Sequence, residues 1–173
     1  MRFADSKKGQ AGLSLVELLV VMGILAVLAA LIVPSYHHFK RQAEKATCLS
    51  HMKSVHAGLG NHWQDKGYWP QMPAEMLEAD ESKFFEFWIK SLEPYGVSQA
   101  NWLCPTDKID PEKWEENKTG SYIPCAFDAR HATPHRWNQP WLMERGNNHG
   151  QGAHIAMPDG SIFPSMKPFE GIR

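Results

Sequence analysis

Histidines in the last third of the chain are the residues whose chemistry first suggests a metal site. His131 and His135 are four residues apart, and His149 and His154 follow them. Imidazoles in such numbers can bind zinc or copper. Pro134, however, lies between the first two and opposes the helix that would bring both side chains to one face. We therefore favour loop and surface positions for these histidines and expect no metal site.

His149 and Asp159 pair an imidazole with a carboxylate, and these are two parts of a hydrolytic triad. No sequence around them is typical of a nucleophile, and Ser161 lies where a turn leads into a strand. The simpler interpretation gives each residue a structural role: Asp159 stabilises a turn, Gly160 supplies a positive φ, and His149 hydrogen-bonds to a loop. We expect no catalytic residue and no enzymatic activity.

The chain has three cysteines, Cys48, Cys104 and Cys125. Cys104 and Cys125 enclose a loop rich in prolines and charges, and a disulfide between them would add roughly 3 kcal/mol by restricting the unfolded chain. Cys48 falls on or beside an apolar helical face, where a free thiol packs as a small hydrophobic group. No two cysteines have the close spacing of zinc ligands, so we expect a Cys104–Cys125 disulfide and no zinc site.

An uncharged apolar run, Leu18 to Val33, lies near the start of the chain. From Leu13 to Pro34 a helix would extend about 33 Å, at roughly 1.5 Å per residue, and this exceeds a hydrocarbon core of about 30 Å. Glu17 lies in its first turn, where a carboxylate would cost roughly 2.5 to 3.5 kcal/mol at the centre of a bilayer and therefore needs a partner. Three basic residues precede the run and indicate a cytoplasmic start: Arg2, Lys7 and Lys8.

The run begins with Gly12-Leu13-Ser14-Leu15-Val16-Glu17, and Pro34 lies downstream. This pattern resembles the amino terminus of type IV pilins and type II secretion pseudopilins. The resemblance implies that a prepilin peptidase cuts between Gly12 and Leu13 and that Leu13 is N-methylated. It also implies that Glu17 pairs with the free amine of a neighbouring subunit on entry into a filament. A plain signal anchor would need neither Glu17 nor the Gly12 junction.

Calcium is the one cofactor that the resemblance brings into question, because some pseudopilins bind it in their carboxy-terminal loops. Asp107, Asp110 and Asp128 are the carboxylates that could contribute here. No dense acidic loop of the EF-hand type is present. Our expectation remains that the protein has no cofactor.

Apolar residues at spacings of three and four, from Phe39 to Trp63, predict that the first helix continues beyond the apolar run. Pro34 lacks an amide donor and should kink this helix or end one hydrogen-bonded turn. A second helix is expected after Ser82, which can serve as its N-cap. Residues 153–157 and 161–163 are predicted strands joined by turn chemistry at 158–160.

Nine residues separate His149 from Asp159-Gly160. This spacing resembles the carboxy-terminal signature of many pilin-like proteins of planctomycete-type bacteria. The segments that begin at Cys48 and at Gly67 resemble a large bacterial group of pilin-like proteins with a processed amino terminus. The two ends of the chain therefore match one architecture.

The sequence predicts an α+β, pilin-like fold in which a long amino-terminal helix packs on a small antiparallel sheet with a loop-rich carboxy-terminal part. We expect a leader at 1–12, a transmembrane and assembly helix at 13–34, and an extracytoplasmic domain at 35–173. The protein would be a single-pass subunit of the inner membrane that enters a periplasmic or surface filament. Its partners would be prepilin peptidase, other subunits, an inner-membrane assembly platform and membrane lipid.

A formal net charge of -1 gives no support for nucleic-acid binding. Two alternatives to the filament subunit remain open. One is a signal-anchored binding module that does not polymerise, and the other is a membrane-anchored enzyme with a metal site built from the late histidines.

Overall fold

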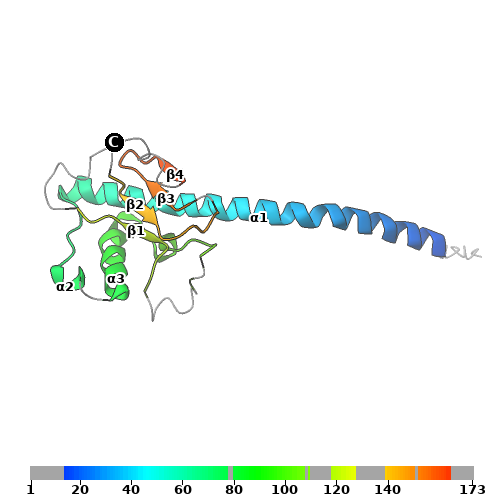
Figure 1. Ribbon diagram of the computed structural model, residues 1–173, viewed down its shortest axis with the longest axis horizontal. Coiled ribbons are helices and arrows are strands. Elements are labelled where there is room, and N and C mark those ends of the chain that lie inside the picture. The colour runs from blue at the N-terminus through cyan, green and yellow to red at the C-terminus, as the bar shows by residue number, and fades with distance from the viewer. Residues whose placement is uncertain are drawn as a thin grey trace, which may run out of the picture. The chain divides into compact units, whose positions relative to one another are not determined.

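A computed structural model describes residues 14–77, 80–107, 109, 118–127, 139–150 and 152–164. The chain divides into an amino-terminal unit, residues 1–40, and a head, residues 41–173, and the first helix contributes to both. Figure 1 shows the elements, which in chain order are α1 (Leu15–Lys66), α2 (Ala74–Leu77), α3 (Glu81–Leu92), the 3₁₀ helices η1 (Glu93–Tyr95) and η2 (Gln99–Trp102), and the strands β1 (Tyr122–Pro124), β2 (Leu142–Glu144), β3 (His154–Ala156) and β4 (Ile162–Pro164).

In the amino-terminal unit, α1 carries the apolar run. Its large apolar side chains from Leu15 to Ile32 are exposed within the chain. Among the described helices, α1 is the one whose length and apolar composition would allow it to cross a membrane. The helix is assigned without interruption through residue 34, so it does not end there, while the kink expected at Pro34 stays a prediction.

In the head, the second part of α1 buries one face. Cys48, Met52, Val55 and Leu59 recur at spacings of four, three and four, and each is at most 1% exposed. This is the face of an amphipathic helix, and it confirms that the helix continues well beyond residue 34. Most of the adjacent positions on α1 are exposed or half-buried, as the 3.6-residue period requires.

Helix α3 covers the core from another side. It is the helix expected after Ser82, and it buries Phe85, Trp88 and Leu92. Its N-cap is Asp80 rather than the predicted Ser82: Asp80 Oδ1 accepts a hydrogen bond from the Lys83 amide, and the Ser82 hydroxyl donates to the same oxygen. A carboxylate is also the better cap because it interacts favourably with the helix dipole.

The strands form one antiparallel sheet in the order β1-β2-β3-β4. Pro124 lies opposite Leu142, Met143 opposite Ile155, and Ile155 opposite Phe163. The β3–β4 hairpin lies where the sequence places its two strands, and β1 and β2 extend the sheet to four. The head therefore has the predicted α+β architecture, a long helix followed by a small antiparallel sheet (Figure 1).

Candidate functional site

The predicted processing and assembly residues lie at the start of the chain. Gly12 and Leu13 lie outside the described residues. Glu17 is exposed within the chain, in the first turn of α1, and its Oε2 atom accepts a hydrogen bond from the Ser14 amide at 2.8 Å. A carboxylate is favoured at this end of a helix by the free amides and the helix dipole. Glu17 thus caps the first described turn of α1, and its predicted roles in processing and assembly stay predictions.

The head contains a disulfide between Cys48 and Cys104, whose Cα atoms are 5.0 Å apart. The predicted Cys104–Cys125 bond is therefore wrong, and Cys125 is the free cysteine. The reason is the direction of β1. The Cys104 amide donates to Ser121 Oγ at 2.9 Å, just before this strand, whereas Cys125 follows its last residue. Four extended residues span about 13 Å, which is too far for a disulfide.

The free cysteine is not set up for reaction. Burial raises the pKa of the Cys125 thiol to about 11, so it stays protonated at neutral pH. Its backbone is fixed on both sides, since its amide donates to the Trp141 carbonyl and its carbonyl accepts from Trp69 Nε1. Cys125 therefore serves the packing of the sheet, the role that the sequence had suggested for Cys48.

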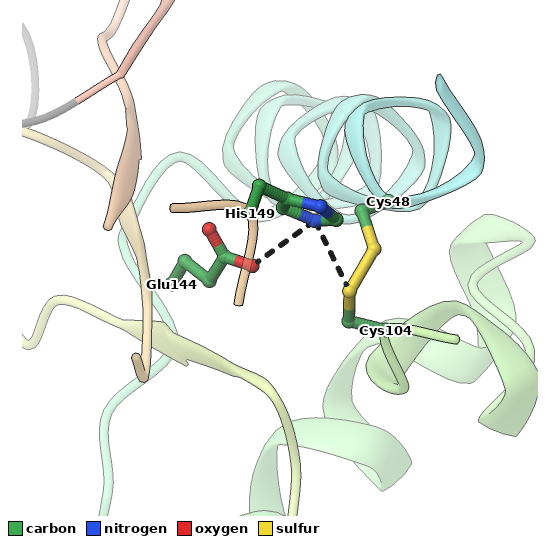
Figure 2. A group of neighbouring side chains, drawn as sticks. All are labelled: Cys48, Cys104, Glu144 and His149. Carbon is green, nitrogen blue, oxygen red and sulfur yellow. Dashed lines mark hydrogen bonds and ion pairs between the residues drawn. A yellow bond between two sulfur atoms is a disulfide. The ribbon is translucent and has the colours of Figure 1, made fainter. Parts of the chain in front are cut away.

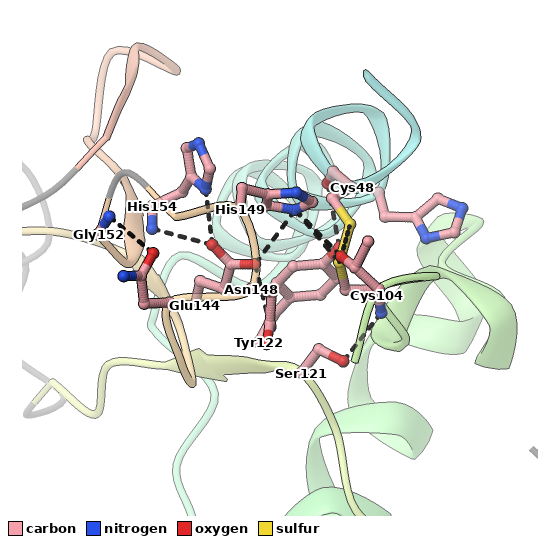
Figure 3. Close-up of polar contacts among 12 residues, drawn as sticks. Cys48, Cys104, Ser121, Tyr122, Glu144, Asn148, His149, Gly152 and His154 are labelled. Carbon is pink, nitrogen blue, oxygen red and sulfur yellow. Dashed lines mark hydrogen bonds and ion pairs between the residues drawn. A yellow bond between two sulfur atoms is a disulfide. The ribbon is translucent and has the colours of Figure 1, made fainter. Parts of the chain in front are cut away.

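His149 lies against the Cys48–Cys104 disulfide, in the loop after β2 (Figure 3). Its Nε2 atom is 3.4 Å from Cys104 Sγ, 3.5 Å from Thr106 Oγ1 and 3.6 Å from Glu144 Oε1. Burial lowers the pKa of His149 below its ordinary value, although the Glu144 carboxylate opposes that shift. A neutral imidazole at this place offers a nitrogen lone pair to the polar atoms around it.

Glu144, at the end of β2, organises the rest of this cluster. Its side chain is 0% exposed, and Oε2 accepts hydrogen bonds from the His154 amide at 3.1 Å and from His154 Nδ1 at 2.6 Å. Asn148 Nδ2 donates to Oε1 at 3.2 Å. The rings of His149 and His154 meet edge to face, with centroids 5.4 Å apart. The carboxylate thus accepts three hydrogen bonds and lies beside two imidazoles, so the surface positions predicted for His149 and His154 are wrong.

Tyr122 closes the cluster from β1 (Figure 3). Its hydroxyl donates to the Cys48 carbonyl at 3.1 Å, so strand β1 is bonded directly to α1 beside the disulfide. Burial, and then the nearby carboxylates of Glu144 and Asp107, raise the pKa of Tyr122. The phenol is therefore a permanent donor here. Strand β1, helix α1 and the turn after η2 are held together at one point.

Asp159 and Gly160 form the other end of the signature. Asp159 Oδ1 accepts from the Ser161 amide at 2.9 Å and from the Ser161 hydroxyl at 2.5 Å, and Gly160 has φ +80°. The expected turn chemistry is therefore present. A Cβ at Gly160 would lie 3.6 Å from His56 of α1, which stacks on Trp141.

The two ends of the signature thus meet α1 at two places, the disulfide at Cys48 and the ring of His56, which are about two helical turns apart. Asp159 is not the carboxylate that faces His149; that carboxylate is Glu144. The strand period offered a signal for Glu144, because it places residue 144 on the same buried face as Leu142. The sequence did not predict a strand at β2, so the position of Glu144 was missed.

Several other candidate ligands lie outside the described residues: His131, His135, Asp110 and Asp128. Of the late histidines, His149 and His154 lie close together. They share the carboxylate of Glu144 and do not lie on one helix face. Asp107 is half-buried, and its amide donates to the Cys104 carbonyl at 2.9 Å in the turn after η2. The expectation that the protein has no cofactor stays a prediction.

Comparison with known proteins supports the resemblance to pilins. Residues 7–33 match the prokaryotic N-terminal methylation motif. The chain is 28% identical over 64 residues to the fimbrial protein EcpC of Eikenella corrodens, an alignment of 37% of this chain and 42% of that protein. It is 25% identical over 118 residues to a fimbrial protein of Neisseria meningitidis serogroup B, covering 65% of this chain and 69% of that protein. Together these matches support a type IV pilin-like protein.

This pilin-like protein spans less than half of the length of EcpC. No solved structure matches it. The methylation motif covers both the predicted junction at Gly12 and the apolar run, and α1 places that run on a helix with unburied apolar side chains. These features fit a membrane-anchored protein with its head outside the cytoplasm.

Proposed function

We propose that this pilin-like protein is a structural subunit of a type IV pilus-like or type II secretion filament. In this proposal a prepilin peptidase cuts after Gly12, and Leu13 becomes the N-methylated first residue. The observation that carries the proposal is the matched motif at residues 7–33, which combines the Gly12 junction, the acid at Glu17 and the apolar helix. The fimbrial relatives support a structural rather than an enzymatic role.

Assembly would use the apolar face of α1. A helix whose large side chains from Leu15 to Ile32 are unburied within the chain is stable in lipid, and it can move from lipid into an equally apolar bundle of helices at little cost. Other subunits would pack against this helix, and an inner-membrane assembly platform would extract it. The filament would be periplasmic or lie on the cell surface, and before assembly the subunit would be a single-pass protein of the inner membrane.

Glu17 would align each subunit with its neighbour as the subunit enters the filament. Its neighbours in the first turn of α1 are apolar, so burial in lipid or in a bundle leaves the carboxylate in need of a cation. The methylated amine of Leu13 in an adjacent subunit would supply that charge. Only aligned subunits would bring the amine to the carboxylate, and a misaligned subunit would leave a buried, unpaired carboxylate, which is costly.

The experiment compares Glu17→Val with the wild-type chain in cells that assemble the filament. We expect the variant to insert into the membrane and to be processed normally but to be absent from sheared filaments. Glu75→Val removes an exposed acid of the head and is the matched control, expected to assemble normally. Filaments containing Glu17→Val at the wild-type level would refute the proposed role of Glu17.

A further inference from the structure

Four potential metal ligands converge in the head. Cys48 Sγ, Cys104 Sγ, a Glu144 carboxylate oxygen and a His149 ring nitrogen all lie within 4.8 Å of one another (Figure 2). They come from α1, the turn after η2, strand β2 and the loop after β2. The side chain of His149 is 4% exposed and that of Glu144 is 0% exposed, and both cysteines are buried. Residues far apart in the sequence thus share one buried point.

The chemistry of these donors is that of a structural zinc site. Thiolate, imidazole and carboxylate are ligands that zinc takes, four at a time in a closed tetrahedron. With Zn–S bonds of about 2.3 Å and Zn–N or Zn–O bonds of about 2.0 Å, neighbouring ligand atoms lie roughly 3.3 to 3.8 Å apart. His149 Nε2 already lies 3.4 Å from Cys104 Sγ and 3.6 Å from Glu144 Oε1. The two sulfur atoms, which are bonded to each other, must move apart, and the four ligand atoms, now within 4.8 Å of one another, must settle at these spacings.

The groups behind these donors are also in place. Glu144 Oε2 is held by His154 through both its amide and its Nδ1 atom, which leaves Oε1 on the side of His149. Asn148 Nδ2 donates to Oε1 at 3.2 Å, and Ser121 Oγ fixes the amide of Cys104. Such outer hydrogen bonds orient metal ligands before the metal arrives. A carboxylate that is 0% exposed also needs a cationic partner, and a divalent ion would supply one.

We propose that the dithiol form of this cluster binds one zinc ion through Cys48 Sγ, Cys104 Sγ, His149 Nε2 and Glu144 Oε1, so that the disulfide and the metal are alternative occupants of one site. A dithiol reductant supplies two electrons and two protons, breaks the S–S bond and closes to its own disulfide. Zinc then forms two Zn–S bonds and displaces the two thiol protons to solvent. Each form ties α1 to the turn after η2, one covalently and the other through the metal. The proposal is independent of filament assembly.

The test uses the full chain in detergent micelles, reduced with a water-soluble phosphine, which is itself oxidised to its phosphine oxide and does not compete for zinc as a dithiol does. Zinc chloride is added, excess metal is removed by desalting, and retained zinc is measured by elemental mass spectrometry. We expect one zinc ion per reduced chain and none per oxidised chain. Cobalt(II) in place of zinc should give the thiolate-to-metal charge-transfer band and the visible bands of a tetrahedral site.

Variants then assign the ligands. His149→Ala should lose the retained zinc, and His154→Ala, which removes an outer hydrogen bond, should weaken zinc binding about ten- to a hundredfold. Cys125→Ala is the matched control, because Cys125 is outside the cluster, and it should keep one zinc ion per chain. The proposal is overturned if the reduced wild-type chain retains no zinc or gives cobalt no thiolate band, a result that does not depend on the folding of any variant. It is also overturned if oxidised and reduced chains, or wild type and a folded His149→Ala chain, retain zinc equally.

Discussion

Replacing Cys48 or Cys104 by alanine should destabilise this protein far more than replacing Cys125. The Cys48–Cys104 disulfide closes a loop with a sequence separation of 56. In the chain-entropy description, a loop of this size restricts the unfolded chain by about 4 kcal/mol, compared with about 3 kcal/mol for the shorter Cys104–Cys125 loop expected from the sequence. Cys48 is also 1% exposed, so the smaller side chain leaves a void beneath α1.

The assay is urea unfolding of the full chain in detergent, followed by tryptophan fluorescence under oxidising, chelator-treated conditions. All seven tryptophans lie in the head, and Trp69, Trp88 and Trp102 are buried in its core, so their emission reports the unfolding of the head. Cys48→Ala and Cys104→Ala should each lower the free energy of unfolding by about 4 kcal/mol. The double variant should cost little more than either single variant, since one bond is lost in every case.

Cys125→Ala is the control for this comparison. Cys125 is half-buried and free, so its replacement should cost about 1 kcal/mol. If Cys48→Ala costs no more than Cys125→Ala, or if the effects of Cys48→Ala and Cys104→Ala add, the assigned disulfide is refuted. A stability loss in Cys125→Ala equal to that in Cys104→Ala would instead restore the pairing expected from the sequence.

Three further predictions concern the head. Gly58→Ala should destabilise the head by about 1 to 3 kcal/mol in urea unfolding, because the added Cβ would lie 2.3 Å from Val97 Cγ2. Gly60→Ala is its control: the nearest atom to the added Cβ is 3.7 Å away, so this change should stabilise α1 by up to about 1 kcal/mol. Burial lowers the pKa of His56 below 6.5, so as the pH falls the unfolded chain protonates this histidine before the folded chain does. The free energy of unfolding should therefore fall as the pH drops below about 6.5. In His56→Phe the urea midpoint should depend less on pH between about 7 and 5. Tyr122→Phe removes the bond to the Cys48 carbonyl and should cost about 1 kcal/mol in the same assay, and an unchanged midpoint would show that this bond contributes nothing.

The elements with strong periodicity could be predicted from the sequence. The apolar run and the three-and-four spacing through Met52, Val55 and Leu59 indicate one long helix, and the structure assigns it as α1. The β3–β4 hairpin was predictable because its strands flank turn chemistry at Asp159 and Gly160. These signals are local, so they survive without knowledge of the rest of the fold.

The polar cluster of the head could not be predicted in the same way. Cysteine pairing is a long-range property, and three cysteines allow three single disulfides that local patterns do not distinguish. Strands β1 and β2 have three residues each, which is too few for the sequence to predict them, and the burial of Glu144 follows from the strand period only once β2 is known to be a strand. His149 was singled out by its spacing from Asp159, but its carboxylate partner is Glu144, which no sequence spacing connects to it.

The central claim, that this pilin-like protein is a processed filament subunit, is tested most directly at its amino terminus. Mass spectrometry of the protein isolated from native membranes would identify the first residue and any modification on it. The account predicts a chain that begins at N-methylated Leu13, which requires cleavage after Gly12. A mature protein that retains Met1 and the leader would contradict it and would leave a signal-anchored head without a filament.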